Sequence, residues 1–190
     1  MKIFPTCLVC SLVFLLFISS LEAVEKPNMI VIFTDDHGYA DLSAQGVLDD
    51  VRTPNIDFLA NHGRRCTAGY VTAPQCVPSR AGLLTGRSQN RFGVESNGED
   101  LGGFGQQITI AERLKEQGYA TGMVGKWHLG TPGQIPEHGF EDVFYSDGRW
   151  ANFNVQGESI KPGSAFPGEY HLEQNNQAAL AFLKRHHDEP

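Results

Sequence analysis

The sequence contains little positive charge. Lys and Arg together number 15 in 190 residues, against 22 Asp and Glu, and the formal net charge is −7. No run of five or more basic residues occurs. A general nucleic-acid surface needs clustered positive charge, so we expect no nucleic-acid partner. Any anionic ligand must be held by a local site.

The sequence also lacks an apolar stretch that would span a bilayer comfortably. The apolar run from Cys7 to Ile18 follows Lys2 and precedes small and polar residues. This is typical of a signal peptide, which predicts cleavage after Ala23 and no stable membrane insertion afterwards. We therefore expect residues 1–23 to direct export through the secretory pathway to the periplasm, the extracellular space or the lysosome. An uncleaved membrane anchor is the alternative, because residues 3–21 carry no charge.

Cysteine is scarce as well. The chain has four cysteines, and signal cleavage would leave only Cys66 and Cys76. Two cysteines do not make a disulfide scaffold. Either they form one bridge that closes a short loop, or Cys76 is kept for chemistry.

What is present is typical of one large α/β domain, or part of one. The apolar run Asn28 to Phe33 predicts a strand buried on both faces of a parallel sheet, and Tyr119 to Val124 predicts a second, weaker strand. Capping and periodicity predict three helices. They span Thr53 to Gly63, Thr109 to Gly118 and Leu172 to His186.

Two long segments predict irregular structure. Residues 86–105 are rich in glycine, and residues 131–169 are rich in glycine, proline and aromatic residues. The glycines at 102–105 lack the spacing of a dinucleotide-binding loop. A strand is expected after the last helix of an alternating α/β chain, so the pattern predicts truncation at Pro190.

Reactive residue types follow both predicted strands. Asp35 and Asp36 come after the first, and Lys126 and His128 come after the second. Ligands of open α/β sheets bind beyond the carboxyl ends of the strands, so these side chains are expected to converge. Paired carboxylates favour Ca²⁺ or Mg²⁺. The alternative is a solvated loop or helix cap for the acids and a surface turn for Lys126 and His128.

A third group of reactive residues surrounds Cys76. Pro78 suits the first turn of a helix, which would place Cys76 at the positive end of the helix dipole. Arg80 adds a fork of donors suited to a tetrahedral oxyanion. A buried cysteine beside an ordinary helix start is the alternative.

Two motifs resemble the signatures of the type I, formylglycine-dependent sulfatase family. The first reads Cys76-x-Pro78-Ser79-Arg80-x-x-Leu83-x-x-Gly86. The second, at its expected place downstream, reads Gly118-Tyr119-x-Thr121-x-x-x-Gly125-Lys126-Trp127-His128. With the aspartate pair, the arylsulfatase-like resemblance covers about residues 27–186.

The resemblance implies an alkaline-phosphatase-like α/β fold, with a central, mostly parallel sheet flanked by helices. Residues 24–190 would form the N-terminal part of its catalytic domain. A separate formylglycine-generating enzyme would oxidise Cys76 to formylglycine, an aldehyde, which excludes a disulfide there and leaves Cys66 as a small buried residue or a free thiol. The hydrated aldehyde would attack sulfur and later release sulfate.

The resemblance also implies roles for the other residues. Asp35, Asp36 and the modified Cys76 would bind a divalent cation, calcium in most relatives, with magnesium as the alternative. Lys126 would bridge the sulfate and the formylglycine, and His128 would hydrogen-bond the diol. With Arg80, they would form the catalytic group around Cys76.

We therefore expect the parent protein to be a sulfuric ester hydrolase acting on sulfated carbohydrates or aryl sulfates. The family's leaving-group histidine, Asp-Asn metal pair and second lysine have no counterpart before Pro190, so the 190 residues alone are expected to hydrolyse little or nothing. Two alternatives stay open. One is a phosphonate monoester or phosphodiester hydrolase of the same fold, and the other is a catalytically silent exported sugar-binding protein.

Overall fold

The computed structural model describes residues 26–98, 100–145, 150–163 and 171–190. The chain divides into two compact units, Met1–Ile30 and Val31–Pro190. The expected signal peptide lies outside the described residues, and in the first unit residues 26–30 form neither helix nor strand. Within the described ranges, no helix is long and apolar enough to cross a membrane.

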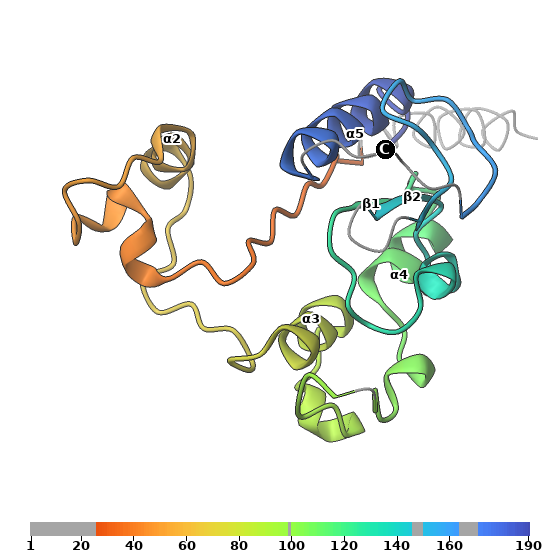
Figure 1. The fold of residues 1–190 in the computed structure, drawn as a ribbon, viewed down its shortest axis with the longest axis horizontal. Helices are drawn as coiled ribbons and strands as arrows, with labels where there is room; N and C mark the ends of the chain where they lie inside the picture. Colours follow the sequence, from red (N-terminus) through yellow and green to blue (C-terminus); the bar gives the residue numbers. More distant parts are fainter. Residues whose placement is uncertain (1–25, 99, 146–149, 164–170) are drawn as a thin grey trace, which may run out of the picture. The chain divides into compact units, whose positions relative to one another are not determined.

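A three-stranded mixed sheet organises the second unit. It consists of β1 (Gly122–Val124), β2 (Asp142–Tyr145) and β3 (Trp150–Ala151), in the order β1-β2-β3. Figure 1 labels the first two of these strands. β1 pairs parallel to β2, and β2 pairs antiparallel to β3. Helix α5 (His171–Arg185) packs against β1 and β2. This mixed sheet with flanking helices confirms the expected α/β class.

The helices predicted from capping and periodicity are present. They are α2 (Pro54–His62), α4 (Ile110–Glu116) and α5, and a further helix, α3 (Cys76–Thr85), begins at the first motif. At α4 the expected capping box forms: the Thr109 hydroxyl accepts from the Glu112 backbone N–H, and the Glu112 carboxylate accepts from the Thr109 backbone N–H. This pair of bonds satisfies two amides that the first turn leaves open.

The predicted buried strand at Asn28–Phe33 is not found. These residues form no strand, and in the run from Met29 to Phe33 each side chain is exposed, Ile32 to 77%. A strand needs a neighbour to accept and donate its backbone hydrogen bonds. No segment among the described residues pairs with this run, and its apolar side chains are therefore left exposed.

The prediction of irregular structure over residues 131–169 is wrong in part. This segment contains β2, β3 and a 3₁₀ helix, η6 (Pro132–His138). The four residues of β2 are too few to show a clear periodicity, although Val143 and Phe144 are fully buried. Residues 86–105 are mainly loop as expected. They contain a short 3₁₀ turn at Gln89–Phe92, and a second one, Phe104–Gln106, begins at the end of the segment.

Two apolar clusters form the core of the second unit. The larger one joins α3 to the second motif, because Val77, Ala81 and Trp127 are all buried in it with Phe104 and Val143. The smaller one lies between α5 and the sheet. Burying each large apolar side chain contributes about 1.5–3 kcal/mol, so the larger cluster fixes α3 and the Trp127 segment to each other.

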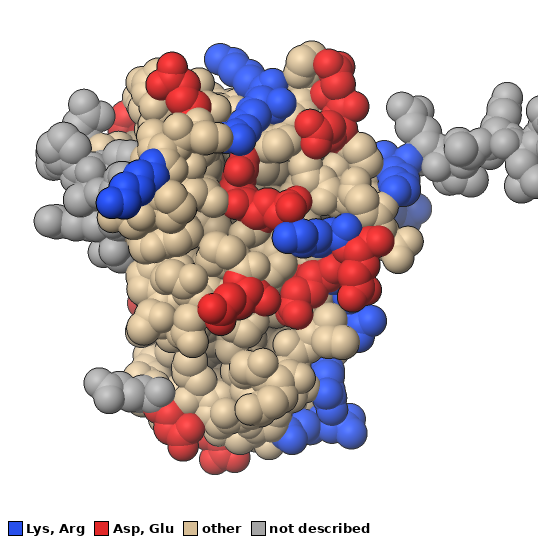
Figure 2. All heavy atoms as spheres, turned by 90° about the vertical axis from the view of Figure 1, so that its right-hand side faces the viewer, with Lys and Arg blue, Asp and Glu red and all other residues tan. Residues whose placement is uncertain are grey.

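Charge is spread rather than gathered on the face of the molecule drawn in Figure 2. Acidic and basic side chains are interspersed there among uncharged residues. Salt screens such scattered exposed charges over about 10 Å. An anion approaching this face therefore meets no broad basic surface.

Candidate active site

Cys76 is the first residue of α3. Gln75 is the N-cap, and Pro78 lies in the first turn as the sequence predicts. Proline fits there because the first-turn N–H groups have no helical partner. Cys76 is half-buried and its thiol is free, so the alternative of a disulfide with Cys66 is not found. Cys66 is an exposed free thiol and not a buried residue.

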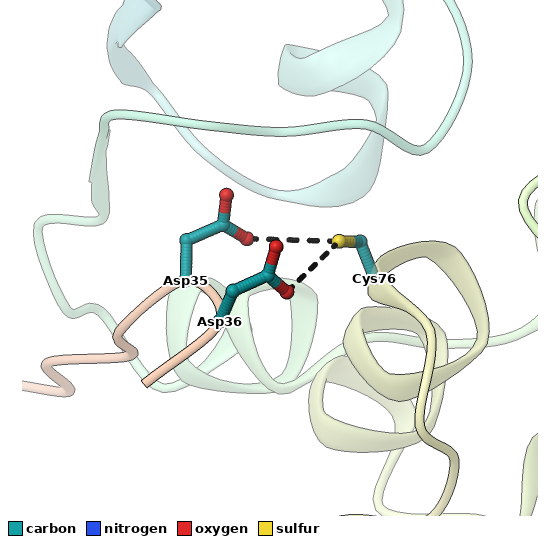
Figure 3. Close-up of side chains that lie close together, drawn as sticks. All are labelled: Asp35, Asp36 and Cys76. Carbon is teal, nitrogen blue, oxygen red and sulfur yellow. Dashed lines mark hydrogen bonds between the residues drawn. The ribbon is translucent and has the colours of Figure 1, made fainter. Parts of the chain in front are cut away.

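The aspartate pair lies against the Cys76 thiol (Figure 3). Cys76 Sγ is 3.7 Å from Asp35 Oδ1 and 3.9 Å from Asp36 Oδ1. One ligand atom from each of the three residues lies within 4.8 Å of the others. The aspartates and Cys76 are therefore brought together, although the segment before Asp35 is not a strand here.

Two cations surround Asp35. Arg80 Nη2 donates to Asp35 Oδ1 at 2.9 Å, and Lys126 Nζ donates to Asp35 Oδ2 at 2.9 Å. Lys126 Nζ also lies 3.6 Å from Cys76 Sγ. Arg80 Nη1 donates to the Lys126 backbone carbonyl at 2.8 Å. These contacts join α3, the aspartates and the second motif in one cluster.

This cluster shifts the pKa values of its members. The hydrogen bond from Lys126, followed by that from Arg80, lowers the pKa of Asp35 against the opposing effect of burial. The hydrogen bond to Asp35 raises the pKa of Lys126. Asp35 is therefore ionised and Lys126 positively charged at neutral pH.

His128 lies beside the cluster and is exposed. Partial loss of hydration, with the positive charges of Lys126 and Arg80, lowers the pKa of His128. A neutral imidazole is thus favoured, which is the form able to accept a proton. Its side chain makes no hydrogen bond to the described residues.

Backbone strain coincides with the site. Among the described residues, the non-glycine residues with positive φ are Asp36, at 51°, and His128, at 59°. Left-handed backbone costs a residue with a Cβ atom of order 1–3 kcal/mol and persists where surrounding contacts enforce it. Both strained residues were singled out by sequence as members of the site.

Sequence reasoning missed two residues that contact this site. The Phe33 ring lies beneath Arg80, with the guanidinium carbon 5.5 Å from the ring centroid. Asn97 bonds to the residues on either side of Cys76. Motif spacing indicates neither contact. The sequence predicts that Phe33 belongs to a buried strand and that Asn97 belongs to a glycine-rich loop.

Comparison with known proteins shows to which family the chain belongs. The family model described as Sulfatase matches residues 27–190. The chain belongs to the sulfatase family. Among curated relatives, it is 43% identical to arylsulfatase A of Bos taurus over 64% of this chain and 25% of that protein. It is 48% identical to N-acetylgalactosamine-6-O-sulfatase of Bacteroides thetaiotaomicron over 56% of this chain and 21% of that protein.

A solved structure agrees with the family assignment. The crystal structure of Ps i-CgsB in complex with k-i-k-neocarrahexaose matches 80% of this chain and 40% of that one, with 30% identity and a TM-score of 0.64. The fold is the alkaline-phosphatase-like α/β fold of the sulfatases. This chain spans about a quarter of the length of the two curated relatives.

Sulfatases generally depend on formylglycine and a metal ion, and the donor chemistry at Cys76 fits both. Asp35 and Asp36 supply hard carboxylate oxygens on one side of the thiol. A thiol sulfur is a poor ligand for Ca²⁺ or Mg²⁺, whereas an oxygen at the same position is a good one. The donor chemistry therefore favours an oxygen over a sulfur at residue 76 for binding such a cation.

Proposed function

We propose that the complete protein is a sulfuric ester hydrolase that releases inorganic sulfate through a formylglycine made from Cys76. The supporting observation is the cluster in which Asp35, Asp36 and Lys126 contact the Cys76 thiol at the N-terminus of α3. This arrangement offers donors and hard ligands to a tetrahedral anion and its nucleophile. The relatives, which are named sulfatases, support the same reaction.

Maturation and export complete the proposal. A formylglycine-generating enzyme oxidises Cys76 to the aldehyde, and residues 1–23 direct the protein into the secretory pathway before they are removed. The remaining residues 24–190 form the N-terminal part of the catalytic domain. Cys76 is only half-buried, which leaves its side chain open to substrate after maturation.

The reaction follows from the chemistry of a hydrated aldehyde. Residue 76 carries two hydroxyl groups, one of which forms a bond to sulfur while the bond from sulfur to the alcohol oxygen breaks. The attacking hydroxyl gives up its proton and the alcohol oxygen takes up one as it leaves, so the proton count of this exchange is unchanged. The second hydroxyl then loses its proton, its oxygen re-forms the carbonyl, and sulfate departs. Water hydrates the aldehyde for the next cycle, so the net reaction consumes one water.

The described residues have distinct roles in this scheme. Lys126 Nζ, 3.6 Å from Sγ, donates a hydrogen bond to the oxygens of residue 76 and the sulfate. Arg80 holds Asp35 and the Lys126 backbone in place. His128, with its lowered pKa, accepts the proton of the diol. Asp35 and Asp36 would hold the divalent cation, Ca²⁺ or Mg²⁺, which supplies Lewis-acid stabilisation of negative charge when bound.

The substrate class is a sulfated carbohydrate or an aryl sulfate. A curated relative is named for a sulfated sugar, and a solved relative is bound to a neocarrahexaose. Specificity in this fold resides in its loops. Neither the phosphonate or phosphodiester hydrolase nor the silent sugar-binding protein gains support from these relatives.

Intact mass of the peptide containing residue 76 tests the proposal directly. The complete protein, co-expressed with a formylglycine-generating enzyme and supplied with calcium, should carry the aldehyde and hydrolyse an aryl sulfate. C76A should lower kcat/KM by about 10⁴-fold or more, because the nucleophile is lost. C66A, which removes an exposed free thiol, is the matched control and should be fully active. A cysteine-only protein, or an active C76A variant, would contradict the mechanism.

A further inference from the structure

Asn97 holds the chain on both sides of Cys76. Its side-chain Oδ1 accepts a hydrogen bond from the Val77 backbone N–H at 2.9 Å, and its own backbone N–H donates to Gln75 Oε1 at 3.0 Å. Val77 lies in the first turn of α3, where backbone N–H groups have no partner within the helix. Asn97 therefore caps this turn from a separate loop.

The bond to Val77 also determines which way the Asn97 amide faces. Only the oxygen of a side-chain amide can accept from an N–H, so Nδ2 must be on the other branch of the planar group. Asn97 is exposed, and its bonds to the described residues use Oδ1 and the backbone N–H but not Nδ2. Two N–H donors are thus fixed in orientation and left open beside the residue that follows Cys76.

We propose that Asn97 binds substrate: its Nδ2 donates a hydrogen bond to a non-bridging oxygen of the sulfate group held at residue 76. The inference rests on the proposed function, which places the sulfate at this residue. The oxygens of a sulfate ester carry negative charge and accept several hydrogen bonds. A neutral donor that is already oriented strengthens such binding without losing much conformational entropy.

Two substitutions at Asn97 separate substrate binding from capping alone. N97A removes both the acceptor and the donors, and kcat/KM for an aryl sulfate should fall by about 10- to 100-fold. N97D keeps an acceptor for the Val77 N–H but puts a negative charge where the donors were. If Asn97 binds sulfate, N97D should be the less active variant, because its carboxylate repels the sulfate. If Asn97 only caps α3, N97D should restore wild-type activity, since an anion suits a helix N-terminus.

The comparison requires a control for charge and for maturation. N55D makes the same change at an exposed position in the first turn of α2, and its kcat/KM should stay within about twofold of wild type. Rates are divided by the fraction of residue 76 found as aldehyde. Thermal unfolding of each variant shows whether the fold is kept.

Calorimetric titration with inorganic sulfate gives a second readout that does not need turnover. Wild-type protein should bind sulfate most tightly, N97A more weakly and N97D weakest of the three. If the wild type binds sulfate but hydrolyses no sulfate ester, the proposed function fails while this order still supports the role of Asn97. Unchanged sulfate binding in N97A, binding by N97D at the wild-type level, or no binding by the wild type would overturn the inference.

Discussion

The two halves of the candidate site are held by different forces. Cys76, Arg80 and Lys126 belong to segments fixed by packing, because the neighbouring Val77 and Trp127 are buried in the larger core. Asp35 and Asp36 follow an apolar run whose side chains are exposed, and ion pairs to Arg80 and Lys126 join Asp35 to the site. Core packing thus holds the half that contains Cys76, and ion pairs hold the half that contains Asp35.

The charged half should respond most strongly to loss of a carboxylate. D36N should lower kcat/KM by about 100-fold, because a neutral amide is a weaker ligand for a divalent cation. Steady-state kinetics with an aryl sulfate, together with calcium binding measured by calorimetry, would check this. D49N changes an exposed aspartate and is the matched control. A D36N variant that binds calcium and turns over like wild type would show that Asp36 is no metal ligand.

The core that fixes the packed half should respond strongly to a small steric change at Gly139, which precedes Phe140, a residue packed against that core. Gly139 has φ at +90°, and a methyl group there would overlap the backbone nitrogen of Glu112 at the capped start of α4. G139A should lower the free energy of unfolding by about 2–4 kcal/mol, since neither backbone can move easily. Urea denaturation would measure it. G105A has open space around the added methyl and should be close to neutral. Equal stability of the two variants would contradict the close approach.

The smallest effect is expected at Phe33, where the two halves meet. Its ring lies beneath Arg80, so F33L should lower kcat/KM by about two- to fivefold through loss of a cation–π contact of about 0.5–1 kcal/mol. F33Y keeps the ring and should restore the wild-type rate. If F33L and F33Y behave alike, the ring does not position Arg80.

Local chemistry made much of the site predictable. Proline at the start of α3 and the Thr109 capping box act within a few residues, so sequence alone locates both helix starts. The convergence of Asp35 and Lys126 followed from the rule for strand ends, although residues 28–33 form no strand in the structure.

Long-range contacts account for what was missed. Asn97 lies in the glycine-rich loop and contacts Val77, 20 positions earlier in the chain, and no local pattern specifies where such a loop returns. The strand β2 was missed because its four residues are defined by their neighbours, β1 and β3, and not by their own periodicity. The exposed run before Asp35 shows the opposite case. Its sequence predicts a buried strand, but a strand is buried only where another segment packs against it.

The left-handed backbone at Asp36 and His128 has a consequence for engineering. Glycine adopts this conformation without steric strain, so where that gain exceeds its entropic cost a screen for heat resistance would favour glycine at both positions. Each replacement would remove a reactive side chain while relieving backbone strain. Selection for thermal stability alone is therefore expected to lower activity first through these two positions.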